Sequence, residues 1–337
     1  MEKRIFNIKG PFELENGQIL ESPEICYHIS GNTTPGNKII WICHALTANS
    51  DPSEWWPGLV GDGKTIDPVK HTIICANMPG SCYGSTGPSS LAPDGKPYLM
   101  RFPEITVRDV VKMHNSLREH LGIDSIYLMT GASIGGFQAL EWSIIYPDIV
   151  ENLLLIACNA AVTPWGCAFN ESQRMALKAD PTFTAQKDIN GGKEGLKAAR
   201  SIALLSYRSQ DGYNQTQSEV DSDFLFAARA SSYQQYQGQK LAERFDAYSY
   251  YTLTKCIDSH NCGRGRGGTA SALGTIKAST VVAGIESDLL FPAAEQEYLA
   301  KHIPGARFRL IRSAYGHDGF LLEYEQTQTI IHQHFKL

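Results

Sequence analysis

Short apolar runs alternate with amphipathic stretches along most of the chain. The runs NKIIWIC (37–43) and HTIICAN (71–77) are rich in β-branched residues, which is typical of strands buried on both faces of a parallel sheet. Residues 4–30 alternate between apolar and polar positions around the turn ENGQ, so we expect an N-terminal hairpin there.

The amphipathic stretches carry helix signals. TVRDVVKMHNSLREHLG (106–122) opens on Thr106 and Asp109, spaced as in a capping box, and ends at a glycine. Further helices are expected around AEQEYLAKHI (294–303) and, as one final element, over roughly FLLEYEQTQTIIHQHF (320–335). The alternation predicts an α/β protein with a mostly parallel central sheet flanked by helices.

The pattern changes between residues 163 and 273. ENLLLIACNA (151–160) is the last strong strand run before this stretch, and STVVAGIESD (279–288) is the first after it. The stretch itself is rich in helical periods and in Gln, Ser, Tyr and Arg. We therefore predict a helical lid over 163–273, inserted into a core formed by 1–162 and 274–337.

The segment GASIGG (131–136) lies between the strand-like run SIYLM and the helix-like run FQALEW. This order is typical of a nucleophile elbow, a sharp turn that presents a serine in strained geometry. Ser133 would occupy its apex, and Gly131 and Gly135 would leave the space that the turn requires. A Gly/Ser turn alone is a weak indication, so its meaning depends on residues further along the chain.

An acid and a histidine follow in the chain order that this fold uses. Asp288 comes directly after TVVAGI, and His317 lies in SAYGHDGF after the run FRLI. Catalytic groups in open α/β sheets gather at the carboxyl ends of the strands, so we predict Ser133, Asp288 and His317 as nucleophile, acid and base. Taken alone, Asp288 could cap a helix starting near Pro292, and His317 could line a surface turn.

Acyl transfer through a serine also needs backbone N–H donors for the oxyanion. We expect one from Ile134, which follows the nucleophile, and one from Leu46 in CHALTAN, which ends the run IIWIC. His44 in that segment is interpreted as a packed or hydrogen-bonded turn residue. The motif HQH (332–334) falls in the last expected helix, where histidines usually form a solvated face, so no metal site is expected.

Composition narrows the class of protein. A chain of 337 residues, 42% hydrophobic and 19% charged, can bury a large core. The net charge of −5 predicts no attraction to nucleic acid or to an acidic membrane. The N-terminus lacks an apolar signal region, and no run approaches the ~20 apolar residues of a membrane span, so the expected location is the cytoplasm. The eight cysteines form no CxxC pair and look like buried thiols.

Nine segments together resemble the homoserine O-acetyltransferases of methionine biosynthesis, a family with the α/β-hydrolase fold. They are CHALTANS (43–50), EWWPGLVGDGKTID (54–67), ANMPGSCYGSTGPSS (76–90), FPEITVRDVV (102–111), GASIGGFQALEW (131–142), FNESQRMALKADP (169–181), YQGQKLAERFDAYSYYTLTKCID (236–258), ESDLLFP (286–292) and YGHDGFL (315–321). The resemblance implies acetyl transfer from acetyl-CoA to the hydroxyl of L-homoserine by a ping-pong route through an acetyl-serine. It implies no bound cofactor, small-molecule substrates and a homodimer packed through the lid.

The resemblance also adds substrate-binding residues. In the family, an arginine and a tyrosine seven residues apart in the lid bind the amino acid, and AARSIALLSYRS places Arg200 and Tyr207 at that spacing. The aspartate beside the catalytic histidine contributes too, which is Asp318 here. A guanidinium matches the carboxylate of homoserine, and a carboxylate can pair with its ammonium. Without the family, Arg200 would be interpreted as a solvated lid residue and Tyr207 as packing.

Several alternatives stay open. The segment 208–233 departs from the family's usual sequence, which leaves the details of the acyl pocket open. The related serine O-acetyltransferases and homoserine O-succinyltransferases share the triad, so the identity of the substrates stays open as well. An esterase would use the same acyl-serine with water as the acceptor, whereas the intact triad disfavours a non-catalytic binding protein. GRGRGG (263–268) could follow a phosphate chain but lacks the GK[ST] of a P-loop, so we interpret it as a flexible exit from the lid.

Overall fold

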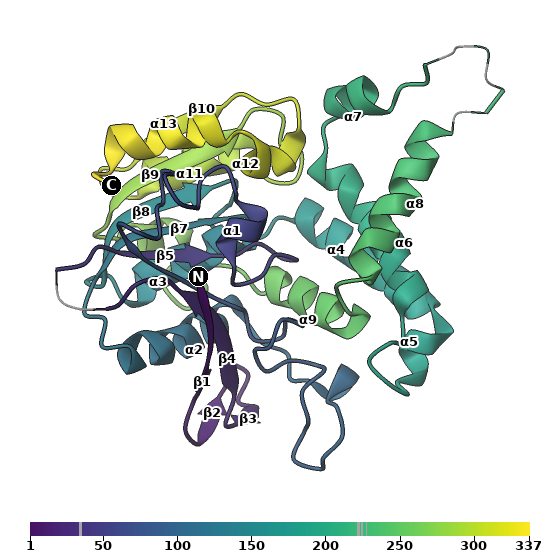
Figure 1. Ribbon diagram of the computed structural model, residues 1–337, viewed down its shortest axis with the longest axis horizontal. Coiled ribbons are helices and arrows are strands. Elements are labelled where there is room, and N and C mark those ends of the chain that lie inside the picture. Colours follow the sequence, from purple (N-terminus) through teal and green to yellow (C-terminus); the bar gives the residue numbers. More distant parts are fainter. Residues whose placement is uncertain (34–35, 221–222, 224, 227) are drawn as a thin grey trace.

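The computed structural model describes residues 1–33, 36–220, 223, 225–226 and 228–337. Among these residues, an eight-stranded sheet carries helices on both faces, and a further group of helices stands to one side of it (Figure 1). The sheet order is β1-β4-β6-β5-β7-β8-β9-β10. This arrangement is the predicted α/β architecture.

The sheet is parallel over most of its width. Its strands are β1 (Glu2–Asn7), β4 (Glu24–Ile29), β5 (Ile39–Cys43), β6 (Thr72–Ala76), β7 (Ile126–Ala132), β8 (Val150–Ile156), β9 (Ser279–Ile285) and β10 (Arg307–Ile311). The pairings of β1 with β4 and of β4 with β6 are antiparallel, and those from β6 to β10 are parallel. The predicted hairpin over 4–30 is two nested hairpins, β1 with β4 and, around ENGQ, β2 (Pro11–Glu13) with β3 (Ile19–Glu21).

The central strands contribute side chains to two apolar layers, one on each face of the sheet. On β5, Trp41 packs into the layer on one face, whereas Ile40 and Ile42 pack into the layer on the other, because successive side chains of a strand point to opposite faces. Helices α2 (Val107–His120), α3 (Ile134–Ile145) and α11 (Ala293–His302) contribute to the first layer, and α13 (Tyr324–His334) contributes to the second. Continuous apolar runs therefore become strands buried on both sides.

Two helix predictions have different outcomes. The capping box of α2 is confirmed, because the Asp109 backbone N–H donates to Thr106 Oγ1 (3.2 Å) and the Thr106 N–H donates to the Asp109 carboxylate (2.9 Å). The single final helix is wrong: the chain forms α12 (Gly319–Leu322) and α13, separated by Glu323 at ψ 49°. The break brings the Tyr324 ring against Gly58, where an added Cβ would lie 2.3 Å from the ring.

The chain between β8 and β9 is helical in its described residues. The helices are α4 (Pro164–Ala179), α5 (Pro181–Ala185), α6 (Lys193–Tyr207), α7 (Gln210–Gln217), α8 (Arg229–Ala242), α9 (Ala247–Asp258) and α10 (Thr269–Leu273). They fall within the predicted lid, 163–273, whose separation from the core as a domain stays a prediction. Four positions of the divergent segment 208–233, namely 221, 222, 224 and 227, lie outside the described residues. No described helix is long and apolar enough to cross a bilayer.

The strand order changes direction at β5. The chain places β6 on one side of β5 and then returns to place β7 on the other side. Ligand sites in open α/β sheets form outside the carboxyl ends of the strands at such a point. The segments that follow β5 and β7 there carry Leu46 and Ser133, respectively.

Candidate active site

Ser133 stands at the apex of a tight turn between β7 and α3. Its backbone has φ 58° and ψ −129°, a region that residues other than glycine rarely adopt. A Cβ on Gly131 would lie 2.3 Å from the Gly135 carbonyl oxygen, and a Cβ on Gly135 would lie 2.2 Å from the Cys43 carbonyl oxygen. The turn therefore needs both glycines, which is the local reason for the GASIGG sequence.

Asp288 and His317 form a buried pair. The ring Nδ1 of His317 and Oδ2 of Asp288 are 2.7 Å apart. The second carboxylate oxygen, Oδ1, accepts from the N–H groups of Leu290 (2.8 Å) and Phe291 (2.9 Å). Both oxygens are thus held, and the carboxylate cannot rotate away from the imidazole. Asp288 does not cap α11, which starts after Pro292 without a side-chain cap.

The environment of His317 sets its protonation. Burial favours the neutral ring and acts to lower its pKa, but the negative charge of Asp288 and the hydrogen bond to it outweigh burial, so the pKa of His317 is raised above 6.5. The Asp288 carboxylate occupies Nδ1, which leaves Nε2 as the ring nitrogen that can exchange a proton with a substrate or with Ser133.

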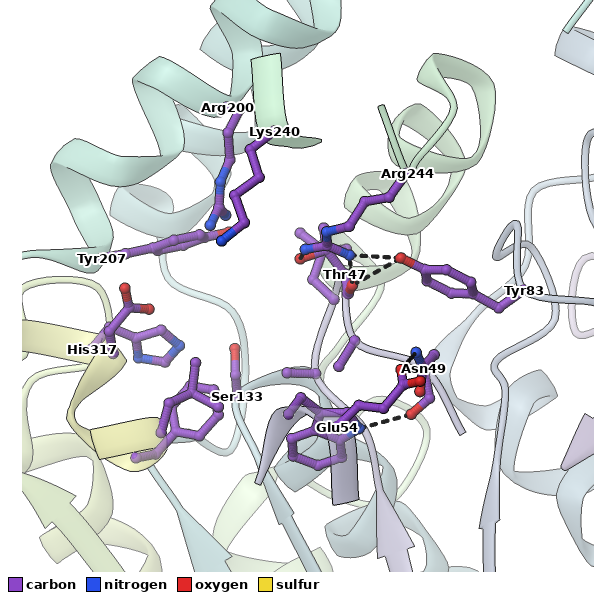
Figure 2. A pocket seen from close by; sticks show the side chains of 17 residues that line it. Thr47, Asn49, Glu54, Tyr83, Ser133, Arg200, Tyr207, Lys240, Arg244 and His317 are labelled. Atoms are coloured by element: carbon purple, nitrogen blue, oxygen red, sulfur yellow. Dashed lines mark hydrogen bonds between the residues drawn. The ribbon is translucent and has the colours of Figure 1, made fainter. Parts of the chain in front are cut away.

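Ser133 and His317 line one cavity of about 500 Å³, a size typical of small-molecule sites. Its wall comes from the loop after β5, the serine turn, the lid helices α6 and α8, and α12. Figure 2 shows Ser133 and His317 at its base, with lid side chains descending from the opposite side. Ser133 is largely covered by its neighbours, since only 9% of its surface is exposed.

The two predicted oxyanion donors are close to Ser133, one in the cavity wall and one next to it in the chain. Leu46 lines the cavity beside Ser133, and Ile134 is the first residue of α3. No described residue accepts a hydrogen bond from the backbone N–H of either. His44 has the predicted turn role: its Nε2 accepts from the Met78 N–H (3.0 Å), and burial lowers its pKa to about 4, so the ring is neutral.

The three residues predicted to bind the amino acid also meet in this cavity. Arg200, Tyr207 and Asp318 all line it, and the Arg200 guanidinium lies 5.4 Å from the centre of the Tyr207 ring, within cation–π range. Asp318 Oδ2 is 3.2 Å from Nε of Arg208. Burial raises the pKa of Asp318, while the charges of Arg208 and Arg200 oppose that rise. The Arg208 partner was missed by sequence reasoning.

The loop that carries His317 packs directly on the end of α6. A Cβ on Gly316 would lie 2.7 Å from the carbonyl carbon of Arg208, and Gly316 has φ 66°. Ser209 Oγ donates a hydrogen bond to the Ala314 carbonyl oxygen. The lid helix that bears Arg200 and Tyr207 is thereby joined, backbone against backbone, to the segment that bears His317 and Asp318.

Sequence reasoning also missed the polar residues at the mouth of the cavity, Lys240, Arg244 and Glu54. Arg244 Nη1 donates to the Thr47 carbonyl oxygen and to the Tyr83 hydroxyl, both at 2.6 Å. Lys240 lies in the last turn of α8 and Arg244 two residues after its end, so no helical spacing in the sequence marked them as a pair.

The GRGRGG segment lies away from this cavity. Arg264 pairs with Glu15 (2.8 Å), and Arg266 pairs with the buried Glu141 (2.7 Å). Arg108 contacts both carboxylates, at 3.1 Å and 3.3 Å. The segment is thus tied to the N-terminal hairpin and to α3. Its interpretation as a flexible exit is wrong in one respect, because its arginines are held in ion pairs.

The histidines of HQH contact other side chains of the protein. His332 Nε2 lies 3.4 Å from Thr65 Oγ1, and His334 Nδ1 lies 3.1 Å from Arg307. Among the described residues, no group of three or more His, Cys, Asp or Glu side chains is placed to hold a metal ion. The eight cysteines are free thiols, and six of them are buried, which agrees with their predicted role in packing.

Comparison with known proteins identifies the family. The model of the alpha/beta hydrolase fold family matches residues 38–324. A homoserine O-acetyltransferase of Cyclobacterium marinum is 44% identical over 336 residues, covering 98% of this chain and 94% of the relative. The chain belongs to the homoserine O-acetyltransferase family. The family resemblance predicted from the nine sequence segments is confirmed.

Solved structures extend this comparison to the fold. The homoserine O-acetyltransferase of Staphylococcus aureus is 29% identical with a TM-score of 0.82, covering 100% of this chain and 97% of that one. The acetyl esterase MekB is 26% identical with a TM-score of 0.86, covering 98% and 95%. Members of the homoserine O-acetyltransferase family thus share their architecture with an esterase, so the residues of the site must distinguish transfer from hydrolysis.

Proposed function

We propose that this family member is a homoserine O-acetyltransferase that moves the acetyl group of acetyl-CoA to the hydroxyl of L-homoserine, in methionine biosynthesis, through an acetyl-Ser133 intermediate. The observation that carries the proposal is the pair of opposite charges, Arg200 and Asp318, in the same cavity as Ser133 and His317. A zwitterionic acceptor needs both charges, whereas water as an acceptor needs neither.

The first half-reaction acetylates the enzyme. His317 Nε2 accepts the Ser133 hydroxyl proton as Oγ forms a bond to the thioester carbonyl carbon. Asp288 stabilises the resulting imidazolium through Nδ1, and the N–H groups of Leu46 and Ile134 stabilise the oxyanion. Collapse of the tetrahedral intermediate breaks the C–S bond, and the coenzyme A thiolate takes the proton from His317.

The second half-reaction transfers the acetyl group to the acceptor. Arg200 binds the homoserine carboxylate beside the Tyr207 ring, and Asp318 binds the ammonium. The homoserine hydroxyl gives its proton to His317 and attacks the acetyl carbonyl carbon. Ser133 Oγ then leaves and regains that proton, which restores the free enzyme. Burial raises the pKa of Asp318, and the charge of Arg208, 3.2 Å away, opposes that rise in favour of the ionised carboxylate that this contact requires.

A recess beside Ser133 supports acetyl over a longer acyl group. Its volume is about 20 Å³, room for little more than one water-sized group. Leu46, Ile257, Leu290 and Phe291 contribute apolar side chains to its wall, and Asn170, Gln173 and Ser206 contribute polar ones. A methyl group fits a recess of this size, whereas the longer succinyl chain with its carboxylate does not. This favours an acetyltransferase over a homoserine O-succinyltransferase.

The setting of the reaction is part of the same proposal. We place the enzyme in the cytoplasm, where acetyl-CoA and amino acids are both substrates of biosynthesis, and we assign it no resident cofactor.

We also propose a homodimer packed through the lid, where Leu205 and Tyr236 are exposed apolar side chains on α6 and α8. Sedimentation of the purified protein tests the dimer, since a monomer at micromolar concentration would contradict it.

The decisive experiment is a matrix of acyl-CoA donors and amino-acid acceptors. Acetyl-CoA or succinyl-CoA is combined with homoserine, serine or no acceptor, and free thiol and acylated amino acid are measured in the same reaction. We expect thiol and O-acetylhomoserine in equal amounts with acetyl-CoA and homoserine, and little of either elsewhere. Thiol release without acylated product in every combination would show an esterase instead.

A further inference from the structure

The mouth of the cavity carries more positive charge than the amino acid requires. Three cations line the cavity, Arg200, Lys240 and Arg244, against two carboxylates, Glu54 and Asp318. Homoserine as a zwitterion uses one charge of each sign, which the proposed function assigns to Arg200 and Asp318. Lys240 and Arg244 then remain, and Glu54 is the one other carboxylate that lines the cavity.

These two cations are not neutralised by neighbouring acids. Among the described residues, Lys240 has no hydrogen-bond or ion-pair partner, and it is exposed. Arg244 donates to the oxygens of Thr47 and Tyr83, which are uncharged. Glu54 is bonded to the side-chain amide of Asn49 at 2.7 Å. The positive charge therefore faces the opening of the cavity.

We propose that Lys240, with Arg244 beside it, binds the phosphate groups of the acyl donor. The proposal rests on the proposed function and adds the residues that recognise coenzyme A. The thioester lies at the end of a long, uncharged pantetheine arm, and the phosphates lie at the opposite end. The proposal places the thioester at Ser133 and the arm along the cavity, so that the phosphates lie at the exposed side chains of Lys240 and Arg244.

The placement of Lys240 fits this role. Figure 2 shows its side chain descending from α8 next to Arg200, with the amine directed into the cavity and Arg244 across the opening. A lysine ammonium binds a phosphate as a mobile point charge, which suits a group held at the end of a flexible arm. A patch of one sign around a cleft also attracts an anionic substrate before it binds. A neutral ester gains nothing from either effect.

The other arginine-rich segment does not compete for this role. Arg264 and Arg266 of GRGRGG are engaged by Glu15 and Glu141 and do not line the cavity. Of the two cations at the mouth, Lys240 gives the cleaner test. Arg244 also holds the Thr47 carbonyl, next to Leu46, so that its loss would disturb the oxyanion amide as well as the charge.

The test compares two donors that differ in their phosphates. kcat/KM is measured with acetyl-CoA and with acetyl-pantetheine, which carries the same thioester and arm without phosphate, for the wild type, Lys240→Gln and Lys193→Gln. Lys193 is an exposed lysine at the start of lid helix α6 that does not line the cavity. We expect Lys240→Gln to lower the ratio of the two kcat/KM values by about tenfold, the usual cost of one hydrogen bond to a charged group, and Lys193→Gln to leave it unchanged.

Ionic strength supplies a second readout. The wild-type kcat/KM for acetyl-CoA should fall as salt rises, and Lys240→Gln should flatten that dependence. An equal loss with both donors would mean that Lys240 only supports the lid, and the proposal would be wrong. It would also be wrong if the wild type used both donors equally well while making O-acetylhomoserine. If neither donor yields that product but the thiol-release ratio still depends on Lys240, the phosphate site stands and the proposed acceptor is wrong.

Discussion

The core and the lid contribute to the cavity in different ways. The core residues Ser133, Asp288 and His317 follow strand ends and are fixed by backbone: a strained φ, two N–H bonds to one carboxylate and a buried ion pair. The lid residues Arg200 and Lys240 are long side chains on helices. Arg200 contacts the Tyr207 ring, and Lys240 has no hydrogen-bond or ion-pair partner within the described part of the chain. A fixed arrangement of the reacting groups favours bond formation. Long charged side chains favour the binding of charged substrate groups.

The difference has a kinetic consequence. Substitutions in the core should stop both half-reactions, because acetylation and transfer use the same three residues. Substitutions in the lid should slow one half-reaction and spare the other, because each charge faces one substrate. Four further variants or profiles, in order of decreasing effect, test whether the two regions separate in this way.

Ser133→Ala should give the largest loss. Without the nucleophile, no acetyl-enzyme forms and turnover falls by about 10⁶-fold, the scale seen when a triad member is removed. Mass spectrometry after mixing with acetyl-CoA should show a mass increase on the wild-type peptide and none on the variant. Acetyl accumulating on another residue, or normal turnover, would remove Ser133 from the mechanism.

Asp288→Asn should cost about 10⁴-fold in kcat, because the amide stabilises the wrong imidazole tautomer and no imidazolium. Circular dichroism should stay close to wild type, since an asparagine oxygen can still accept from Leu290 and Phe291. Glu286→Gln, two positions earlier and exposed, is the matched control and should keep full activity. A loss of only a few fold in Asp288→Asn, with a large loss in Glu286→Gln, would reverse the assignment.

Arg200→Ala should affect the acceptor half-reaction alone. Removing a charge-assisted contact costs roughly 1.5–3 kcal/mol, which is about a tenfold to hundredfold loss in kcat/KM for homoserine. The burst of thiol release from acetyl-CoA should stay near wild type in stopped-flow measurements, and Arg229→Ala, on lid helix α8 outside the cavity, should change neither. A slowed burst with an unchanged acceptor KM would assign Arg200 to the coenzyme instead.

The pH profile should show the smallest change. His317 must be neutral to accept the serine proton, and its pKa is raised in the folded protein by Asp288. kcat/KM for acetyl-CoA should therefore fall as pH decreases through a value above 6.5, and the loss should reach tenfold per pH unit well below it. An acid limb below 6.5 would show that Asp288 does not stabilise the imidazolium in the free enzyme.

The site residues of the core could be predicted from the sequence more fully than those of the lid. Strand runs, turn glycines and chain order were enough to predict Ser133, Asp288 and His317, because each sits at a strand end whose position follows from local pattern. Arg200, Tyr207 and Asp318 came from the family resemblance alone. Their local pattern, charged or aromatic residues at helical spacing, is the same for a solvated face.

The remaining contacts depend on how distant segments meet. The pair of Arg208 with Asp318 joins residues 110 positions apart in the chain, and the ion pairs of Arg264 and Arg266 join the lid exit to Glu15 and Glu141. Nothing in the local sequence of either partner specifies such a contact. The break at Glu323 was missed as well, and the contact beside it, of Tyr324 with Gly58, again joins residues far apart in the chain.

The seam between Gly316 and Arg208 limits how such enzymes can be redesigned. No side chain separates the two backbones there, so neither segment can shift without the other. A lid grafted from an esterase onto this core would bring its own version of residues 207–212, and the histidine loop at 313–318 would have to be exchanged with it. Acceptor preference and the position of the general base are therefore inherited as one unit, and directed evolution of a new acceptor should yield paired substitutions on the two sides of this seam.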